Sequence, residues 1–206
     1  MGQSKKEESE TRCRLLAASV DLFYDKGVNA TTLEDIASAA GVSRGAIYWH
    51  FGNKLGLFSA LYSEMHRNFM EPILEKGPEV EGDPLDKLAE LCVKSLSDVQ
   101  TNVKIRKMIS IFYQKCDYSG DMAPFLQDQN QKTKEMVLTT ATFFERAVKQ
   151  KVLPEHTDCT LLAYSLFCYM YGLTIENIRH PECKEFPRKA QAVIGIFFRG
   201  LRAVQE

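Results

Sequence analysis

The residues best suited to contact another molecule gather between positions 44 and 54. They combine a guanidinium, two aromatic side chains with hydrogen-bond donors, an imidazole and an ammonium group, in Arg44, Tyr48, Trp49, His50 and Lys54. Such groups donate hydrogen bonds to phosphate oxygens, and arginine also reaches the edges of bases. Gly45 stands among them and would allow another backbone to approach closely. The chemistry indicated is recognition of nucleic acid.

Two short helices separated by a glycine turn would position these side chains. A helix is predicted from Leu33 to Ala40, because Thr31 and Thr32 can accept backbone N–H groups at its start. Gly41 follows where the chain must turn, since glycine tolerates positive φ without strain. Ser43 can cap a second short helix, whose outer face carries the side chains named above. This arrangement is a helix-turn-helix, in which the second helix enters the major groove of DNA.

Each of these residues has a predicted role on DNA. Arg44 and Tyr48 are predicted to contact bases or the groove, and Gly45 to allow close approach. The predicted phosphate contacts are Thr32, Ser43, Trp49, His50 and Lys54. Lys54 lies in the first turn of the next helix, where a cation opposes the helix dipole unless an anion is held there. We also expect Glu34 and Asp35 to turn away from the basic face.

The run TTLEDIASAAGVSRGAIYWHFGNKLGLF, residues 31–58, closely resembles the DNA-binding segment of TetR-family transcriptional regulators. Within that family it resembles the AcrR-like branch, which represses multidrug efflux pump genes. Residues 82–85, the segment FYQKCDYSGDMAP and the pair Leu153–Pro154 resemble the ligand-binding domain of the same branch. Gly56 departs from the pattern, because many relatives carry an acidic or polar residue there. We therefore expect a loose start to the fourth helix.

The resemblance implies a ligand-responsive repressor that binds a palindromic double-stranded DNA operator as a homodimer and controls a multidrug efflux pump operon. Small hydrophobic compounds would bind among the fourth to eighth helices, shift the fourth helix and release the DNA. Aromatic, methionine and a few polar side chains could line one cavity: Tyr62, His66, Phe69, Met108, Phe112, Gln129, Thr133, Met136 and Met170. For each residue taken singly, packing in the core is the simpler alternative.

Composition bounds the class of protein. The 206 residues are 45% hydrophobic and 26% charged, with a net charge of −1, which is typical of a soluble globular protein. Residues 1–54 hold seven Lys or Arg against seven Asp or Glu, so DNA affinity must depend on local placement of cations and on a dimer. The start, MGQSKKEESE, has no apolar core for a signal peptide. We expect a cytoplasmic protein with a disordered tail over residues 1–9.

Helical periodicity predicts an all-α fold of about nine helices, without any defensible strand pattern. A three-helix DNA-binding domain is predicted over residues 1–54, and a helical ligand-binding and dimerisation domain over residues 55–206. Besides the helix-turn-helix, helices are predicted over residues 10–26, 53–74, 85–100, 103–116, 124–151, 160–178 and 188–204.

The helix over residues 160–178 is hydrophobic nearly all round and must be covered on both sides. Its apolar run of about 15 residues is too short to span a bilayer, which needs about 20. A second copy of the chain would cover it, and the helix over 188–204 offers a matching stripe. The predicted interface residues are Leu166, Tyr169, Leu173, Val193, Phe197 and Leu201. Burial wholly within one chain is the alternative.

Signals for an enzyme or a metal site are poor. Nucleotide loops, nucleophile elbows and HExxH motifs are missing, and His180 with Cys183 makes only a weak ligand pair. We therefore expect no catalytic residues, metal or cofactor. Six cysteines without a CxxC pair leave open a redox-sensing regulator on the same scaffold. A helical small-molecule-binding protein without a DNA role is the other alternative.

Overall fold

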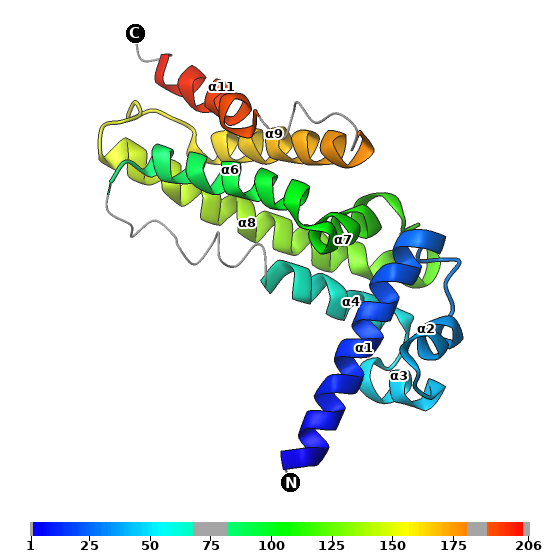
Figure 1. The fold of residues 1–206 in the computed structure, drawn as a ribbon. Helices are drawn as coiled ribbons and strands as arrows, with labels where there is room; N and C mark the ends of the chain where they lie inside the picture. Colours follow the sequence, from blue (N-terminus) through cyan, green and yellow to red (C-terminus); the bar gives the residue numbers. More distant parts are fainter. Residues whose placement is uncertain (1, 68–81, 181–188, 204–206) are drawn as a thin grey trace. The chain divides into compact units, whose positions relative to one another are not determined.

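The computed structural model describes residues 2–67, 82–180 and 189–203, and every regular element within these ranges is helical (Figure 1). The predicted all-α fold is confirmed. The helices are α1 (Gly2–Lys26), α2 (Leu33–Ala40), α3 (Arg44–Phe51), α4 (Lys54–Met65), α6 (Pro84–Thr101), α7 (Val103–Gln114), α8 (Ala123–Lys149), α9 (Cys159–Arg179) and α11 (Ala190–Ala203), with a short 3₁₀ helix, η2 (Gly120–Met122), before α8. None of them is long and apolar enough to cross a membrane.

The helices form two compact units. The first unit holds α1 to α4, residues 104–128 and therefore nearly all of α7; the second holds α6, α8 from Gln129 onward, α9 and α11. In the first unit α7 is tied to α1, because Lys107 Nζ lies 2.6 Å from Asp21 Oδ1. The helix-turn-helix thus belongs to a unit larger than residues 1–54. The predicted functional division at residue 54 stays a prediction.

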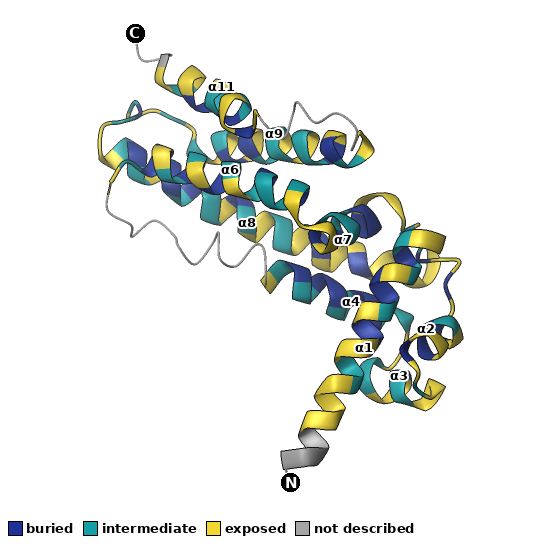
Figure 2. Cartoon of the chain, viewed as in Figure 1, coloured by how far each residue is buried: buried dark blue, intermediate teal, exposed yellow. Residues whose placement is uncertain are grey.

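The first helix is longer than expected. We predicted disorder over residues 1–9, but the helical backbone of α1 begins at Gly2. Glu7, Glu8 and Glu10 are good helix formers, and extending an existing helix costs much less than nucleating a new one. Residues 6–10, which are charged or polar, therefore continue α1 as an exposed stretch without an apolar face (Figure 2).

Helix α2 begins and ends as predicted. Thr32 Oγ1 accepts a hydrogen bond from Asp35 N at 3.1 Å, and Asp35 Oδ2 accepts one from Thr32 N at 3.0 Å, which forms a reciprocal capping box. These hydrogen bonds lower the pKa of the Asp35 carboxyl. Gly41 ends the helix in the left-handed region at φ 64°. Thr31 differs from the prediction: it is buried, and its hydroxyl donates to Gly27 O at 2.7 Å.

An aromatic cluster forms the core of the first unit. Phe58 on α4 is fully buried, with its ring centroid 4.9 Å from that of Phe112 on α7 and 4.7 Å from that of Phe125 on α8. Tyr62 packs edge-on against the same two rings at 5.1 and 5.0 Å. Tyr118 stacks on Phe125 at 5.7 Å. These five residues, Phe58, Tyr62, Phe112, Tyr118 and Phe125, are called the aromatic cluster below.

The second unit has its own core between α6, α8, α9 and α11. Leu88, Phe144, Leu166 and Ile194, one from each helix, are buried in it. The seven helices predicted outside the helix-turn-helix agree with the structure within a few residues at each end, except that α1 starts earlier and residues 68–74 of the fourth lie outside the described residues.

Candidate DNA-binding site

Helix α3 exposes the face that the sequence assigned to DNA. Its buried residue is Ile47, whereas the side chain of Trp49 is 78% exposed and that of Tyr48 is 44% exposed. Tyrosine and tryptophan combine an apolar ring with a hydrogen-bond donor, which is why they are enriched where proteins contact a partner. His50 is half-buried, and Ser43 stands at the N-cap although its hydroxyl caps no backbone N–H. The first turn of α3 and its aromatic residues are therefore accessible on the surface.

The guanidinium of Arg44 is held by two neighbours. Its Nη2 donates to the Tyr48 hydroxyl at 2.8 Å, and its carbon Cζ lies 5.3 Å from the centre of the Tyr48 ring. Its Nη1 forms an ion pair with Glu34 Oε1 on α2. The hydrogen bond that Arg44 donates to Tyr48 and the charge of Glu34 raise the pKa of Arg44. The expectation that Glu34 turns away from the basic face is wrong, because α2 and α3 cross where Glu34 reaches the first turn of α3.

Lys54 has partners that the sequence did not indicate. Its Nζ donates to Val28 O at 3.0 Å and to Asn29 O at 3.3 Å, both in the turn between α1 and α2. These carbonyl oxygens supply the negative partial charge that we expected from phosphate at the start of α4. An ammonium group has three donors, so the two carbonyls do not exhaust it. Lys54 braces the turn, and its phosphate contact stays a prediction.

Replacing Lys54 with methionine is expected to lower the free energy of unfolding by about 1–2 kcal/mol, because the carbonyl oxygens of Val28 and Asn29, the first of them partly buried, lose their donor. If the ammonium also reaches phosphate, the salt dependence of DNA binding should fall by about one charge. Urea unfolding and binding titrations over a salt series measure the two effects. Lys87→Met is the control, since Lys87 forms only an exposed ion pair with Glu90 on α6. An unchanged unfolding energy would contradict the bracing role.

The junction between α3 and α4 brings two backbone segments close together. Asn53 Oδ1 accepts a hydrogen bond from Gly56 N at 2.8 Å, which caps α4 without a reciprocal partner. A Cβ built on Gly56 would lie 2.0 Å from the carbonyl oxygen of Phe51. Glycine at position 56 therefore permits the close approach of two backbones. The predicted lack of a reciprocal capping box is confirmed, and the loose helix start stays a prediction.

The turn between α1 and α2 is also fastened to the end of α7, within the same unit. Val28 N donates to Lys115 O at 2.9 Å. Asn29 and Asp117 exchange two hydrogen bonds: Asn29 Nδ2 donates to Asp117 O at 3.2 Å, and Asp117 N donates to Asn29 Oδ1 at 2.9 Å. The sequence carried no signal for these contacts, because the partners are 88 residues apart. The helix-turn-helix and α7 should therefore move together.

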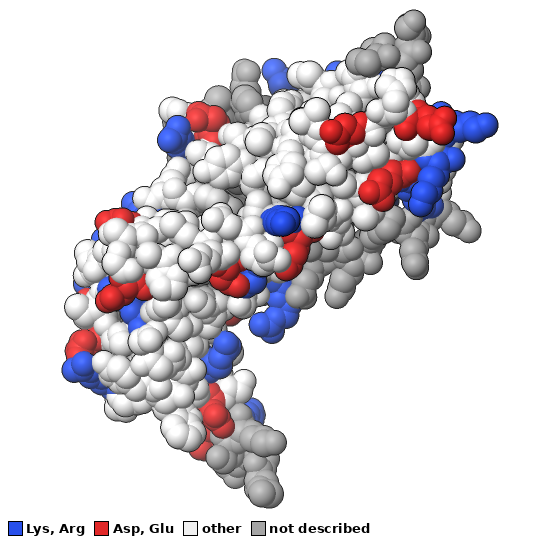
Figure 3. All heavy atoms as spheres, turned by 180° about the vertical axis from the view of Figure 1, so that it is seen from behind, with Lys and Arg blue, Asp and Glu red and all other residues white. Residues whose placement is uncertain are grey.

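Charges on the surface are mixed. On the face drawn in Figure 3, acidic and basic side chains are interspersed. In the first unit Lys26 lies 3.7 Å from Asp35, and Arg44 pairs with Glu34. DNA binding must therefore depend on individual side chains around α3 rather than on a broad basic field.

Comparison with known proteins shows the family to which this helix-turn-helix protein belongs. Residues 15–61 match the family of bacterial regulatory proteins called tetR, and residues 83–202 match the C-terminal region of MAATS-type transcriptional repressors. The chain belongs to the TetR family. The helix-turn-helix and the predicted family are thereby confirmed. TetR-family proteins are transcriptional regulators, in agreement with the expectation of a regulator.

Three relatives illustrate the match. The HTH-type transcriptional regulator AcrR of Shigella flexneri is 32% identical over 194 residues, which cover 94% of this chain and 90% of AcrR. The structure of NalD, the secondary repressor of the MexAB-OprM multidrug efflux pump in Pseudomonas aeruginosa, matches with a TM-score of 0.81 and 30% identity over 95% of this chain and 98% of NalD. The complex of SmeT from Stenotrophomonas maltophilia with triclosan matches with a TM-score of 0.82 and 25% identity, over 92% of this chain and 90% of SmeT.

The predicted ligand residues of this TetR-family protein fall in both units. In the first, Met108, Tyr62 and Phe112 are buried, and the last two belong to the aromatic cluster, where burial raises the pKa of the Tyr62 hydroxyl. His66 is half-buried beside Tyr62, with ring centroids 6.4 Å apart. In the second unit Gln129 is buried, and three residues are half-buried: Thr133, Met136 and Met170. Phe69 lies outside the described residues. Their joint role in binding a ligand stays a prediction.

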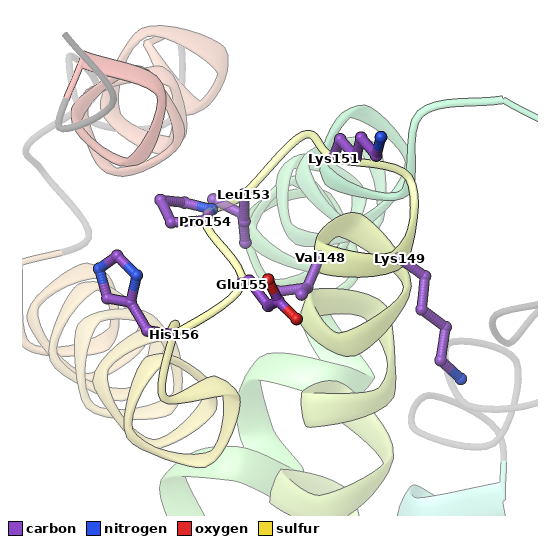
Figure 4. A pocket seen from close by; sticks show the side chains of 7 residues that line it. All are labelled: Val148, Lys149, Lys151, Leu153, Pro154, Glu155 and His156. Atoms are coloured by element: carbon purple, nitrogen blue, oxygen red, sulfur yellow. The ribbon is translucent and has the colours of Figure 1, made fainter.

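A hollow of about 830 Å³ opens in the second unit at the turn after α8 (Figure 4). Val148, Leu153 and Pro154 give it an apolar wall. The side chains of Lys149, Lys151 and His156 at its rim point in different directions (Figure 4). They do not converge on one point, so the hollow lacks the focused polar groups of a binding site.

The predicted dimer residues are engaged within their own chain. Leu166 is only 3% exposed in the core of the second unit. The Tyr169 hydroxyl donates to Val193 O at 2.8 Å, and its ring stacks on Phe197 with centroids 5.6 Å apart. Leu173 and Leu201 pack half-buried against the same core. Leu166 is therefore covered within the chain, whereas the predicted interface role of the five half-buried residues stays a prediction: Tyr169, Leu173, Val193, Phe197 and Leu201.

The cysteines bear on the redox alternative. Burial raises the pKa of the Cys92 thiol to about 12, and burial together with the Asp117 carboxylate raises that of Cys116 to about 11. Thiols react as thiolates, so both are poorly reactive at neutral pH. Cys13 and Cys168 are exposed. Cys183, which the sequence offered with His180 as a weak pair of metal ligands, lies outside the described residues.

Proposed function

We propose that this TetR-family protein is a transcriptional repressor that binds a palindromic DNA operator as a homodimer, is released by small hydrophobic compounds and controls a multidrug efflux pump. The observation that carries the proposal is the exposed face of α3, with Arg44, Tyr48 and Trp49 on the second helix of the helix-turn-helix. The repressor role of NalD and the triclosan bound to SmeT support the choice of gene and ligand class.

The dimer is proposed to form through a different face of α9 from the one predicted. Large apolar side chains are exposed there at helical spacing, Leu161 (61%), Tyr164 (45%) and Tyr171 (43%), together with Ile196 (63%) on α11. We call these four residues the α9–α11 stripe. A second copy related by a two-fold axis would cover it. Two α3 helices would then meet DNA half-sites about 34 Å apart, or a multiple of this.

Selection of bound fragments from a random DNA library tests the DNA function. The expected result is a palindromic sequence, called the selected DNA below, that also occurs beside the gene of this protein. Triclosan is the probe for the ligand response, and it should weaken binding to the selected DNA in an anisotropy titration. Recovery of DNA without any common sequence would contradict the proposed function and favour a helical ligand-binding protein without a DNA role.

A charge in the α9–α11 stripe tests the dimer. Leu161→Glu is expected to give a monomer in sedimentation experiments, because a buried carboxylate without a partner strongly opposes association. Affinity for the selected DNA should fall at least about tenfold, since each half-site then binds alone. Val103→Glu places the same charge at another exposed aliphatic residue, on α7, and should leave the dimer intact. A dimeric Leu161→Glu protein would show that another surface carries the association.

A further inference from the structure

Helix α2 contributes a carboxylate to the first turn of α3. Glu34 and Arg44 form an ion pair across the two helices, and their side chains are 54% and 60% exposed. An ion pair this exposed contributes little to folding stability. The effect of this ion pair should therefore appear in how Arg44 contacts DNA rather than in the stability of the fold.

Two contacts from different helices restrict the Arg44 side chain. Glu34 holds Nη1, while Tyr48 accepts from Nη2 at 2.8 Å and offers its ring to the guanidinium. A guanidinium has five N–H donors, so three remain for a base edge or a phosphate after these two contacts. A long side chain loses rotamer freedom when it binds, and this loss of entropy opposes binding. Because Arg44 is already restricted, it should lose less entropy when it contacts DNA.

The charge of Glu34 acts in a second way. Electrostatic attraction between basic side chains and phosphates is the same for any DNA sequence, whereas hydrogen bonds to base edges depend on the sequence. A carboxylate beside Arg44 cancels part of the general attraction, and residues 1–54 are otherwise balanced in charge. Base contacts through the remaining N–H groups keep their geometry. Glu34 should therefore weaken binding to random DNA more than binding to the operator.

We propose that Glu34 is a specificity-determining positioning residue, which orients Arg44 for base contact and suppresses binding to random DNA. It acts through Arg44 and need not touch DNA itself. The inference rests on the proposed function, since it concerns the DNA contact of α3. It adds a residue of α2 that the family match and the sequence prediction did not assign to specificity.

The experiment compares the selected DNA with random DNA of equal length, by anisotropy titration over a salt series. Glu34→Gln is expected to bind random DNA about two- to fivefold more tightly and to discriminate about fivefold less. Tyr48→Phe, which removes the hydroxyl acceptor and keeps the ring, should also reduce discrimination. Glu90→Gln is the matched control, because it removes the carboxylate of an exposed ion pair on α6; its discrimination should equal that of the wild type.

A double mutant separates positioning from charge alone. In an Arg44→Ala background, Glu34→Gln should cost clearly less discrimination than in the wild-type background, because the side chain that Glu34 orients is missing and only the effect of its charge remains. An equal loss of discrimination in the two backgrounds would overturn the proposal, as would a Glu34→Gln protein that discriminates as well as the wild type. Those results leave the proposed function intact. A wild-type protein that binds both DNAs equally would overturn both.

Discussion

Replacing Arg44 with alanine is expected to reduce the preference for the selected DNA over random DNA by about 5- to 150-fold. This range corresponds to the roughly 1–3 kcal/mol that one good bidentate contact between an arginine and a base contributes to discrimination. Arg44 lies in the first turn of α3, exposed and oriented by Glu34 and Tyr48. Competition titrations with the two DNAs at one fixed salt concentration measure the preference directly.

Two further variants make the Arg44 result specific. Arg44→Lys keeps the charge but loses the planar pair of donors, so it should retain general affinity and lose most of the preference. Lys26→Ala also removes an exposed cation paired with a carboxylate, Asp35, and should change binding to both DNAs alike. Full discrimination by the Arg44→Ala protein would refute the base contact.

Replacing Phe58 with alanine is expected to lower the free energy of unfolding by about 3–5 kcal/mol. Phe58 is fully buried and contacts the rings of Phe23, Phe112 and Phe125, so its loss leaves a cavity between three helices. Such a loss is a large share of the roughly 5–15 kcal/mol that stabilises a typical protein. Urea unfolding followed by circular dichroism measures it, and DNA binding should fail at lower temperature than in the wild type.

A more conservative variant tests the packing of the aromatic cluster. Phe58→Leu keeps much of the buried volume and should cost clearly less than Phe58→Ala. If Phe58→Ala lost less than about 1 kcal/mol, the rings would not be closely packed around position 58. The space would then be available to a ligand, which would favour the predicted ligand role of Tyr62 and Phe112 over their role in the core.

Local signals explain why the helix-turn-helix could be predicted from the sequence. The Thr32 cap, the acidic first turn and Gly41 act on residues at most a few positions away, so the bounds of α2 follow from the run itself. Trp49 is exposed on the outer face, as predicted, while Ile47 on the same helix is buried. The apolar period was enough to place the later helices within a few residues, because amphipathic helices bury one face.

Contacts between distant segments could not be predicted. The sequence placed Lys54 at a helix start, but the oxygens that it binds lie 25 and 26 residues earlier. It marked α9 as apolar all round, yet only packing within the core of the second unit decides that Leu166 is covered and Leu161 is exposed. Helical spacing identifies the faces of a helix; which face another helix covers depends on the tertiary arrangement.

The sequence by itself determined the family, the helical fold and the surface of α3 that can meet DNA, since these depend on short-range spacing and capping. The tertiary structure alone brought Glu34 to Arg44, Asn29 to Asp117 and Lys54 to the turn after α1. Each of these pairs joins two different elements, and a charge or an amide in a sequence does not specify its partner until the helices cross.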